Sequence, residues 1–132
     1  MPVCYKVERW NDSMPPNPAM LRSRLSAEGY EVFQWSDLPG AVYGLHMHSE
    51  DQSHWIISGS IELTVESVGS VVLGPGDRDY MPAGCYHSAR VIGDSPVIYL
   101  IGAKRAADSP SDERKTCSFD EMASSLLERF RE

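Results

Sequence analysis

The sequence lacks long apolar runs, is poor in cysteine and has fewer basic than acidic residues. Its 132 residues include 3 cysteines, and Cys4, Cys85 and Cys117 are too far apart to indicate a disulfide framework or a thiolate zinc site. No apolar segment approaches the length of a membrane span, and the first residues contain no apolar core of a signal peptide. These absences predict a cytoplasmic protein with no membrane partner.

The charge balance narrows the class of partner. The chain has 12 lysines and arginines against 19 aspartates and glutamates, a formal charge of -7. Binding to nucleic acid or to an anionic membrane favours a basic surface, so neither is expected as the main partner. A small-molecule ligand fits this composition better, and the length suits one domain with one hydrophobic core.

Residues 1–29 are expected to form an N-terminal arm that ends in a short helix. Asn17 can cap this helix, and the proline that follows it suits a first helical turn. Leu21 and Leu25 lie four residues apart and therefore share one face, and Gly29 can end the helix.

Residues 30–102 have a different texture, in which short runs rich in β-forming residues are separated by glycine, proline or acidic turns. This spacing predicts an all-β domain, an antiparallel sandwich or barrel. The expected strands cover residues 30–35, 41–48, 54–58, 61–66, 71–73, 79–81, 87–92 and 97–101.

Residues 103–132 are expected to form a solvated linker followed by an amphipathic helix. Ser118 and Glu121 have the spacing of a capping box. Behind them an apolar stripe with helical spacing comprises Phe119, Met122, Ala123, Leu126, Leu127 and Phe130. Such a stripe needs an apolar surface to cover, either on the chain's own barrel or across a dimer.

The histidines are the main functional signal. Of the 4 in the chain, His46, His48 and His54 fall within nine residues, and His87 lies in a second patterned stretch. Residues two apart on a strand point to the same face, so His46 and His48 can present two imidazoles side by side. Because imidazole is a common metal ligand at neutral pH, a third histidine on another strand would complete one side of a metal site.

Two stretches carry a family resemblance. The first contains Gly40, His46, His48, Gln52 and Gly59, and the second reads Gly, five residues, Pro, one residue, Gly, two residues, His87. In order and spacing they resemble the two motifs of the cupin superfamily, and the chain is similar to small single-domain cupins. The resemblance implies a jelly-roll-like barrel, one divalent metal ion such as Fe, Mn, Ni or Zn, and a homodimer.

The resemblance also implies which residues bind the metal. His46 and His48 match the ligands of the first motif, and His87 matches the ligand of the second. Gln52 stands where the family usually has glutamate. A neutral amide neutralises less of the metal's positive charge than a carboxylate does, so the site would bind the ion more weakly. Two alternatives stay open, namely that Glu50 supplies the carboxylate or that no fourth protein ligand exists.

His54 has a separate expected role. It follows Gln52 by two residues, so on a continuing strand it faces the interior and could act as a general acid or base. The alternative is a buried histidine hydrogen-bonded to the backbone. Cupin lyases that act on sulfonium substrates resemble this spacing but carry tyrosine in place of His54.

Two neighbouring features are expected to be structural. Tyr43, Leu45 and Met47 alternate with the histidines along their strand, so all three should point away from the metal ligands. Asp77, Arg78 and Asp79 follow a glycine–proline–glycine turn and are expected to form a solvated turn.

Two classes of function remain open. A metal bound by three histidines, with open positions, could support dioxygenase, isomerase or lyase chemistry on a small molecule. Alternatively the same metal could serve a noncatalytic binding or sensor protein. No residue in the sequence decides whether the chain is an enzyme.

Overall fold

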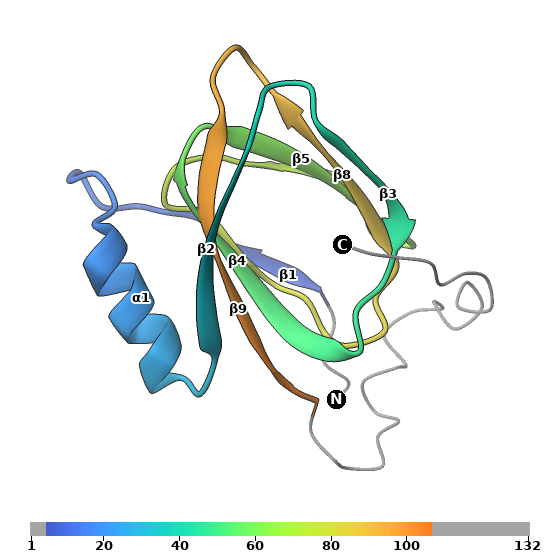
Figure 1. Ribbon diagram of the computed structural model, residues 1–132, viewed down its shortest axis with the longest axis horizontal. Helices are drawn as coiled ribbons and strands as arrows, with labels where there is room; N and C mark the ends of the chain where they lie inside the picture. Colours follow the sequence, from blue (N-terminus) through green and yellow to red (C-terminus); the bar gives the residue numbers. More distant parts are fainter. Residues whose placement is uncertain (1–4, 107–132) are drawn as a thin grey trace.

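The computed structural model describes residues 5–106, which form two facing antiparallel β-sheets and one helix (Figure 1). The five-stranded sheet has the order β1-β7-β4-β9-β2, and the four-stranded sheet has the order β3-β8-β5-β6. The strands are β1 (Lys6–Glu8), β2 (Glu31–Asp37), β3 (Val42–His46), β4 (Glu50–Ser58), β5 (Ser60–Val65), β6 (Gly69–Leu73), β7 (Arg78–Tyr80), β8 (His87–Ile92) and β9 (Val97–Arg105). This architecture confirms the predicted all-β barrel.

The structure adds a strand to the predicted N-terminal arm and does not describe the predicted C-terminal helix. A short strand, β1, comes from the N-terminal arm and pairs with β7 at the edge of the five-stranded sheet. The expected C-terminal helix, with its stripe from Phe119 to Phe130, lies outside the described residues.

The predicted N-terminal helix is present as α1 (Pro18–Ala27), and the side chain of Asn17 caps it by accepting a hydrogen bond from the Met20 backbone N–H at 3.1 Å. Leu21 and Leu25 are buried against Trp55 of β4 and Leu100 of β9, on the outer face of the five-stranded sheet. Each buried leucine stabilises the contact by about 1.5–3 kcal/mol. In the described part of the chain, no helix has the length and apolar character needed to cross a membrane.

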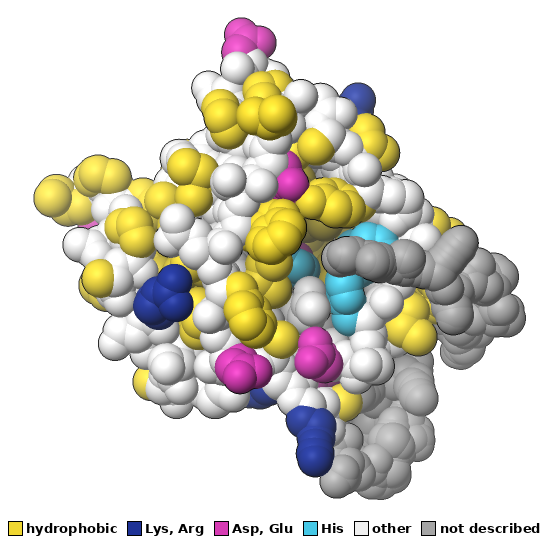
Figure 2. Space-filling view, in the orientation of Figure 1, with side chains coloured by type: hydrophobic (Ala, Val, Ile, Leu, Met, Phe, Trp, Pro, Cys, Tyr) yellow, Lys and Arg dark blue, Asp and Glu magenta, His cyan; other side chains and the backbone are white. Residues whose placement is uncertain are grey.

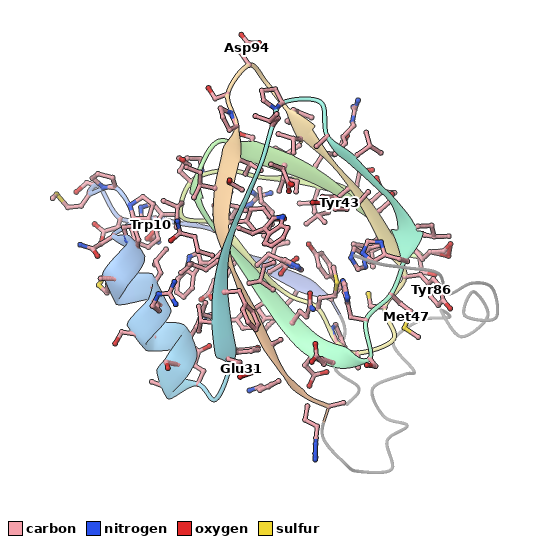
Figure 3. All side chains as sticks on the ribbon, in the orientation of Figure 1. Trp10, Glu31, Tyr43, Met47, Tyr86 and Asp94 are labelled. Carbon is pink, nitrogen blue, oxygen red and sulfur yellow. The ribbon has the colours of Figure 1, made fainter. Side chains whose placement is uncertain are left out.

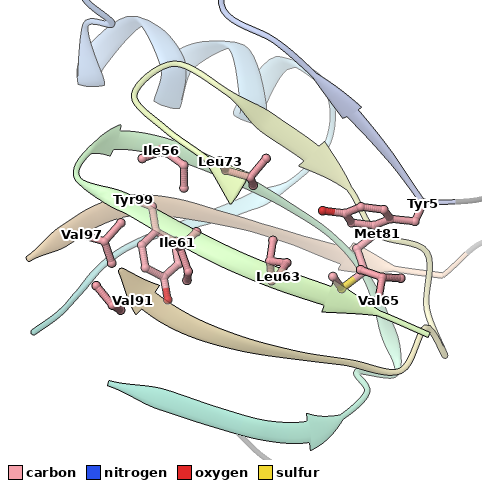
Figure 4. Close-up of a cluster of buried hydrophobic side chains, with 10 residues drawn as sticks. All are labelled: Tyr5, Ile56, Ile61, Leu63, Val65, Leu73, Met81, Val91, Val97 and Tyr99. Carbon is pink, nitrogen blue, oxygen red and sulfur yellow. The ribbon is translucent and has the colours of Figure 1, made fainter. Parts of the chain in front are cut away.

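The main core lies between the two sheets (Figure 4). Its buried members come from both sheets: Tyr5, Ile56, Ile61, Leu63, Val65, Leu73, Met81, Val91, Val97 and Tyr99. Four of these, Ile56, Ile61, Leu63 and Tyr99, also line an open cavity. The core therefore fills part of the space between the two sheets, and its four cavity-lining residues form one wall of the open part.

Gly59 makes the tight turn from β4 to β5. Its φ of 81° is in the left-handed region, and a Cβ there would overlap the Pro96 carbonyl oxygen and the Val97 Cα. Only glycine fits this close approach without strain. The turn therefore fixes the start of β9 beside the end of β4.

Candidate metal centre and cavity

A cavity of about 690 Å³ opens into the barrel, and all four histidines of the chain lie in its wall. Figure 2 shows hydrophobic side chains gathered around the hollow, with histidine side chains visible inside it. Gln52 and Glu50, the two candidates for a further ligand, also lie in the wall.

Three of the histidines form one cluster. The candidate ligand atoms of His46, His48 and His87 all lie within 4.8 Å of one another. His46 ends β3 and His87 begins β8, and the two residues are directly paired across these antiparallel strands. His48 follows two residues after the end of β3, with its ring centroid 4.9 Å from that of His46 and 5.2 Å from that of His87.

Backbone carbonyls orient two of these rings. The Nδ1–H of His46 donates to the Gly44 carbonyl at 2.6 Å, and the Nδ1–H of His87 donates to the Cys85 carbonyl at 3.0 Å. A neutral imidazole that donates through Nδ1 carries its lone pair on Nε2, the arrangement found in histidines that bind metals. Burial, together with the nearby His46, lowers the pKa of His87 well below its ordinary value, so its ring is neutral at pH 7.

Backbone contacts hold the first motif against the second. The Gly84 N–H donates to the His48 carbonyl at 2.8 Å, and the Ala83 N–H donates to the Asp51 carboxylate at 2.8 Å. Gln52 and Met81 exchange two backbone hydrogen bonds, each of 2.8 Å. These bonds fix the turn before His87 relative to the loop that carries His48.

The two alternatives for a fourth ligand differ in burial. Gln52 is 8% exposed, whereas Glu50 is exposed at the start of β4. Among the histidine, cysteine and carboxylate groups of residues 5–106, the group close enough to share one metal ion consists of His46, His48 and His87 and does not include Glu50. The amide of Gln52 is therefore the more buried of the two oxygen donors in the cavity wall.

His54 has a carboxylate partner. Its Nδ1 lies 3.0 Å from Asp79 Oδ1, and its backbone N–H donates to the same oxygen at 2.8 Å. Tyr5 donates its hydroxyl to Asp79 Oδ2 at 3.0 Å. Burial disfavours the charged imidazolium, but the negative charge and hydrogen bond of Asp79 outweigh this penalty and raise the pKa of His54. With Nδ1 held by Asp79, Nε2 is the nitrogen with which His54 can meet a ligand in the cavity.

The expectation of a solvated turn at residues 77–79 was wrong for two of its three residues. Arg78 is 2% exposed and Asp79 is fully buried, and both belong to β7. The cause is tertiary packing, because β7 lies between β1 and β4 within the five-stranded sheet, Arg78 packs against Trp55 and Glu28, and Asp79 packs against Tyr5 and His54. Asp79 was therefore missed as a functional candidate. The sequence did contain one signal, because Asp79 is also the first residue of the strand expected over residues 79–81.

The expectation that Tyr43 points away from the metal ligands was also wrong. Tyr43 pairs with Ala89 and His46 pairs with His87, so three steps along β3 match two steps along β8. This bulge shifts the alternation of side chains by one residue and turns Tyr43 into the cavity (Figure 3). A bulge of this kind leaves no trace in the alternation of the sequence.

Tyr43 belongs to a polar cluster that sequence reasoning missed. Asp37, at the end of β2, accepts the Tyr43 hydroxyl at 2.7 Å and the Tyr99 hydroxyl at 3.1 Å. The Trp35 indole N–H in turn donates to the Tyr43 oxygen at 3.3 Å. Tyr99 could have been suspected, because it alternates with Val97 and Ile101 on the apolar face of an expected strand.

Comparison with known proteins places these features in a family. The family profile described as "Cupin domain" matches residues 33–101, just over half of the chain. The matched range contains every histidine of the cavity and the Asp37, Tyr43 and Tyr99 cluster.

Among curated proteins, the chain is similar to the dimethylsulfoniopropionate lyase DddQ of Ruegeria pomeroyi, with 32% identity over 62 residues. The match covers 47% of this chain but only 30% of the lyase, so the chain spans less than a third of that relative. The crystal structure of the same lyase superposes with a TM-score of 0.53 and 26% identity, over 59% of this chain and 39% of the lyase.

Two other solved structures have a similar barrel. A mutant of Bacillus subtilis oxalate decarboxylase matches with a TM-score of 0.51 and 27% identity, over 58% of this chain and 22% of the enzyme. A duf861 family protein from Thermotoga maritima matches with a TM-score of 0.51 over 76% of this chain and 99% of its own length. Its identity of 21% supports a likeness of fold alone.

Proposed function

The chain belongs to the cupin family, and we propose that His46, His48 and His87 hold one divalent metal ion beside a bound small molecule. The observation that carries this proposal is the convergence of the three imidazoles within 4.8 Å. Backbone carbonyls hold the Nδ1 atoms of two of them, which leaves neutral Nε2 donors suited to a borderline divalent metal such as Fe, Mn, Ni or Zn.

Gln52 is proposed as the fourth protein donor. Its side chain is buried in the cavity wall, and its backbone is fixed by the bonds to Met81. An amide oxygen adds no negative charge, so the four donors together are neutral. Such a site holds its ion less tightly than one with glutamate, and the ion withdraws electrons from a bound ligand more strongly.

The geometry favours proton-transfer chemistry of the lyase or isomerase class. When bound, the metal would supply Lewis-acid activation of an oxygen atom of the ligand. His54 lies in the same cavity wall, and Asp79 fixes its orientation through Nδ1. Its Nε2 is therefore the atom that would exchange a proton with a ligand in the cavity, as general acid when the ring is protonated and as general base when it is neutral. The similarity to a protein named as a lyase is in keeping with this class.

The second candidate is a noncatalytic protein that binds a metal and a small molecule. Gln52 favours it, because a neutral donor in place of glutamate weakens metal retention. The two candidates share the metal site and differ in the role of His54. A His54→Ala variant that retains metal and ligand binding but loses turnover supports an enzyme. Binding without turnover in the unaltered chain supports a binding protein.

Metal analysis tests the shared site. The purified protein is stripped with a chelator, reloaded separately with Mn²⁺, Fe²⁺, Ni²⁺ or Zn²⁺, and analysed by inductively coupled plasma mass spectrometry. We expect about one ion per chain for at least one of these metals. His87→Ala should lose this ion, whereas His54→Ala, altered in the same cavity, should keep it. Failure to load any of the four metals would refute the site.

Replacing Gln52 tests the fourth donor. Gln52→Glu adds a carboxylate of the same length and should slow metal loss to a chelator by about tenfold or more. Gln34→Glu, which adds the same carboxylate elsewhere in the cavity wall, is the matched control and should not slow it. Equal retention in Gln52→Glu and the unaltered chain would exclude Gln52 as a ligand.

A further inference from the structure

The cavity has a second polar feature, away from the three clustered histidines. Tyr43 precedes His46 by three residues along β3, and Tyr99 pairs with Ile56, four residues along β4 from Gln52. At about 3.3 Å per residue, these separations place the two tyrosines on the order of 10 Å along the barrel from the histidine cluster. Both tyrosines and Trp35 line the same cavity.

The polar tips of these three aromatic side chains are all engaged. The two phenols donate to Asp37, and the Trp35 indole donates to the Tyr43 oxygen. Burial, together with the charge of Asp37, raises the pKa of Tyr99, so its phenol keeps the proton that it donates. Trp35, Tyr43 and Tyr99 therefore line the cavity with aromatic side chains whose donors are already used within the cluster, the two phenols by Asp37 and the indole by Tyr43.

The described cavity wall around the three aromatic side chains has no permanently cationic group. Among the described residues that line it, Glu31 and Glu50 are acidic, and none is lysine or arginine. Within residues 5–106 no lysine or arginine forms an ion pair with Asp37 either. The carboxylate is hydrogen-bonded by phenols instead of being neutralised by a cation. Its field and the negative faces of the rings both attract a positive group.

We propose that Trp35, Tyr43, Tyr99 and Asp37 form a subsite for an alkylated cation, such as a quaternary ammonium or a sulfonium group. The aromatic faces supply cation–π attraction and a surface for the alkyl groups, and Asp37 supplies the countercharge. Trp35 is 51% exposed and Tyr99 is 7% exposed, so the subsite extends from the cavity mouth into the barrel.

This subsite, taken with the proposed metal function, specifies a substrate class. The ligand would carry a positive alkylated group at one end and an oxygen donor for the metal at the other. A small dianion is disfavoured at the subsite, because Asp37 repels a second negative charge and none of the described lining residues is a lysine or arginine. The subsite itself depends on the aromatic cluster and not on the metal.

Choline and 3,3-dimethylbutan-1-ol are the probes that test the charge preference. They share one shape and differ in whether the central atom is a positive nitrogen or a neutral carbon. Binding is measured by NMR titration of chelator-treated and metal-loaded protein. We expect choline to bind about tenfold more tightly in both forms. Equal affinity for the two probes would overturn the subsite.

Two variants locate the preference. Asp37→Asn keeps the shape but removes the charge and should reduce the choline preference severalfold. Trp35→Leu alters a half-exposed side chain, so the fold should survive, and it should also reduce the preference. Glu62→Gln, on the surface pair with Arg90, is the control and should leave it unchanged. A preference that survives in both cavity variants would refute this assignment.

The outcome is separable from that of the metal proposal. Protein that prefers choline but binds none of the four metals keeps the subsite and refutes the metal centre. Protein that loads metal but binds the two probes with equal affinity keeps the metal centre and refutes the subsite.

Discussion

Two adjacent buried charges, Arg78 and Asp79, lie on opposite faces of β7 and are stabilised in different ways. On the outer face, the Arg78 guanidinium donates to both oxygens of Glu28, at 2.9 and 3.2 Å. It also lies 4.4 Å from the Trp55 ring and 4.3 Å from the Tyr80 ring. On the inner face, Asp79 accepts from Tyr5 and from His54.

The difference separates a structural cluster from a functional one. Arg78 is paired with a group of full opposite charge at the end of α1, and its Nε also donates to Ser53, so it joins the helix to the sheet. Asp79 is paired with a histidine that can gain or lose a proton and that lines the cavity. A buried charge with a fixed partner stabilises the fold, whereas one with a titratable partner can serve chemistry.

The largest expected effect comes from Arg78→Met. The substitution leaves Glu28 unpaired and removes the contacts with two aromatic rings, so it should cost about 2–3 kcal/mol of unfolding free energy. Urea denaturation of the chelator-treated protein measures this loss. Arg90→Met breaks an exposed ion pair with Glu62 and should cost less than about 1 kcal/mol. Similar losses in the two variants would show that the outer cluster is no more stabilising than a surface pair.

The strands were the most predictable part of the molecule. Alternation such as that of Ile61, Leu63 and Val65, with glycine and proline turns between the runs, indicated where the strands lie. The spacing of Asn17, Leu21 and Leu25 likewise identified α1. These signals depend on local backbone preference and on one buried face, both of which are written in neighbouring residues.

The surroundings of the site were less predictable, because they depend on pairing between distant segments. His46 and His87 could be grouped by motif, but the Asp79 partner of His54 required β7 to lie beside β4. The inward direction of Tyr43 required a bulge in its pairing with β8. Neither fact follows from alternation, since β7 consists of Arg78, Asp79 and Tyr80, polar residues that are normally exposed, and a bulge reverses the alternation locally.

The next largest effect is expected from Asp79→Asn on the inner face. The amide keeps the shape but loses the charge-assisted bonds, so unfolding free energy should fall by about 1–2 kcal/mol. The pKa of His54 should fall, because the negative charge that raises it is gone. NMR titration of the His54 ring measures this shift in chelator-treated protein. An unchanged pKa would mean that Asp79 does not control His54.

A smaller effect is expected from Tyr5→Phe. This change removes one donor to Asp79 and leaves both hydrogen bonds from His54 in place, so it should cost about 1 kcal/mol. Tyr80→Phe, which removes an exposed hydroxyl bonded to Glu8, is the matched control and should cost less. Thermal unfolding of both variants makes the comparison. A larger loss in Tyr80→Phe would contradict the view that Asp79 depends on buried donors.

The smallest effect is the pH dependence of stability contributed by His54. Its pKa is raised in the folded chain, so the folded state binds more protons than the unfolded state above the ordinary histidine pKa of about 6.5. The stabilisation is therefore complete below about pH 6.5 and declines as the pH rises through the folded pKa.

Urea denaturation of the unaltered chain and of His54→Gln, both chelator-treated, isolates this contribution across the pH range. Subtracting the two unfolding free energies removes most of the opposite contribution of His87, whose lowered pKa removes stability as the pH falls below about 6.5 and depends only in small part on His54. The difference should shrink as the pH rises, because His54 then loses the charge that Asp79 attracts. If the difference in unfolding free energy instead grows with pH, His54 and Asp79 do not form the charged pair described above. The contrast between the two faces of β7 would then be wrong.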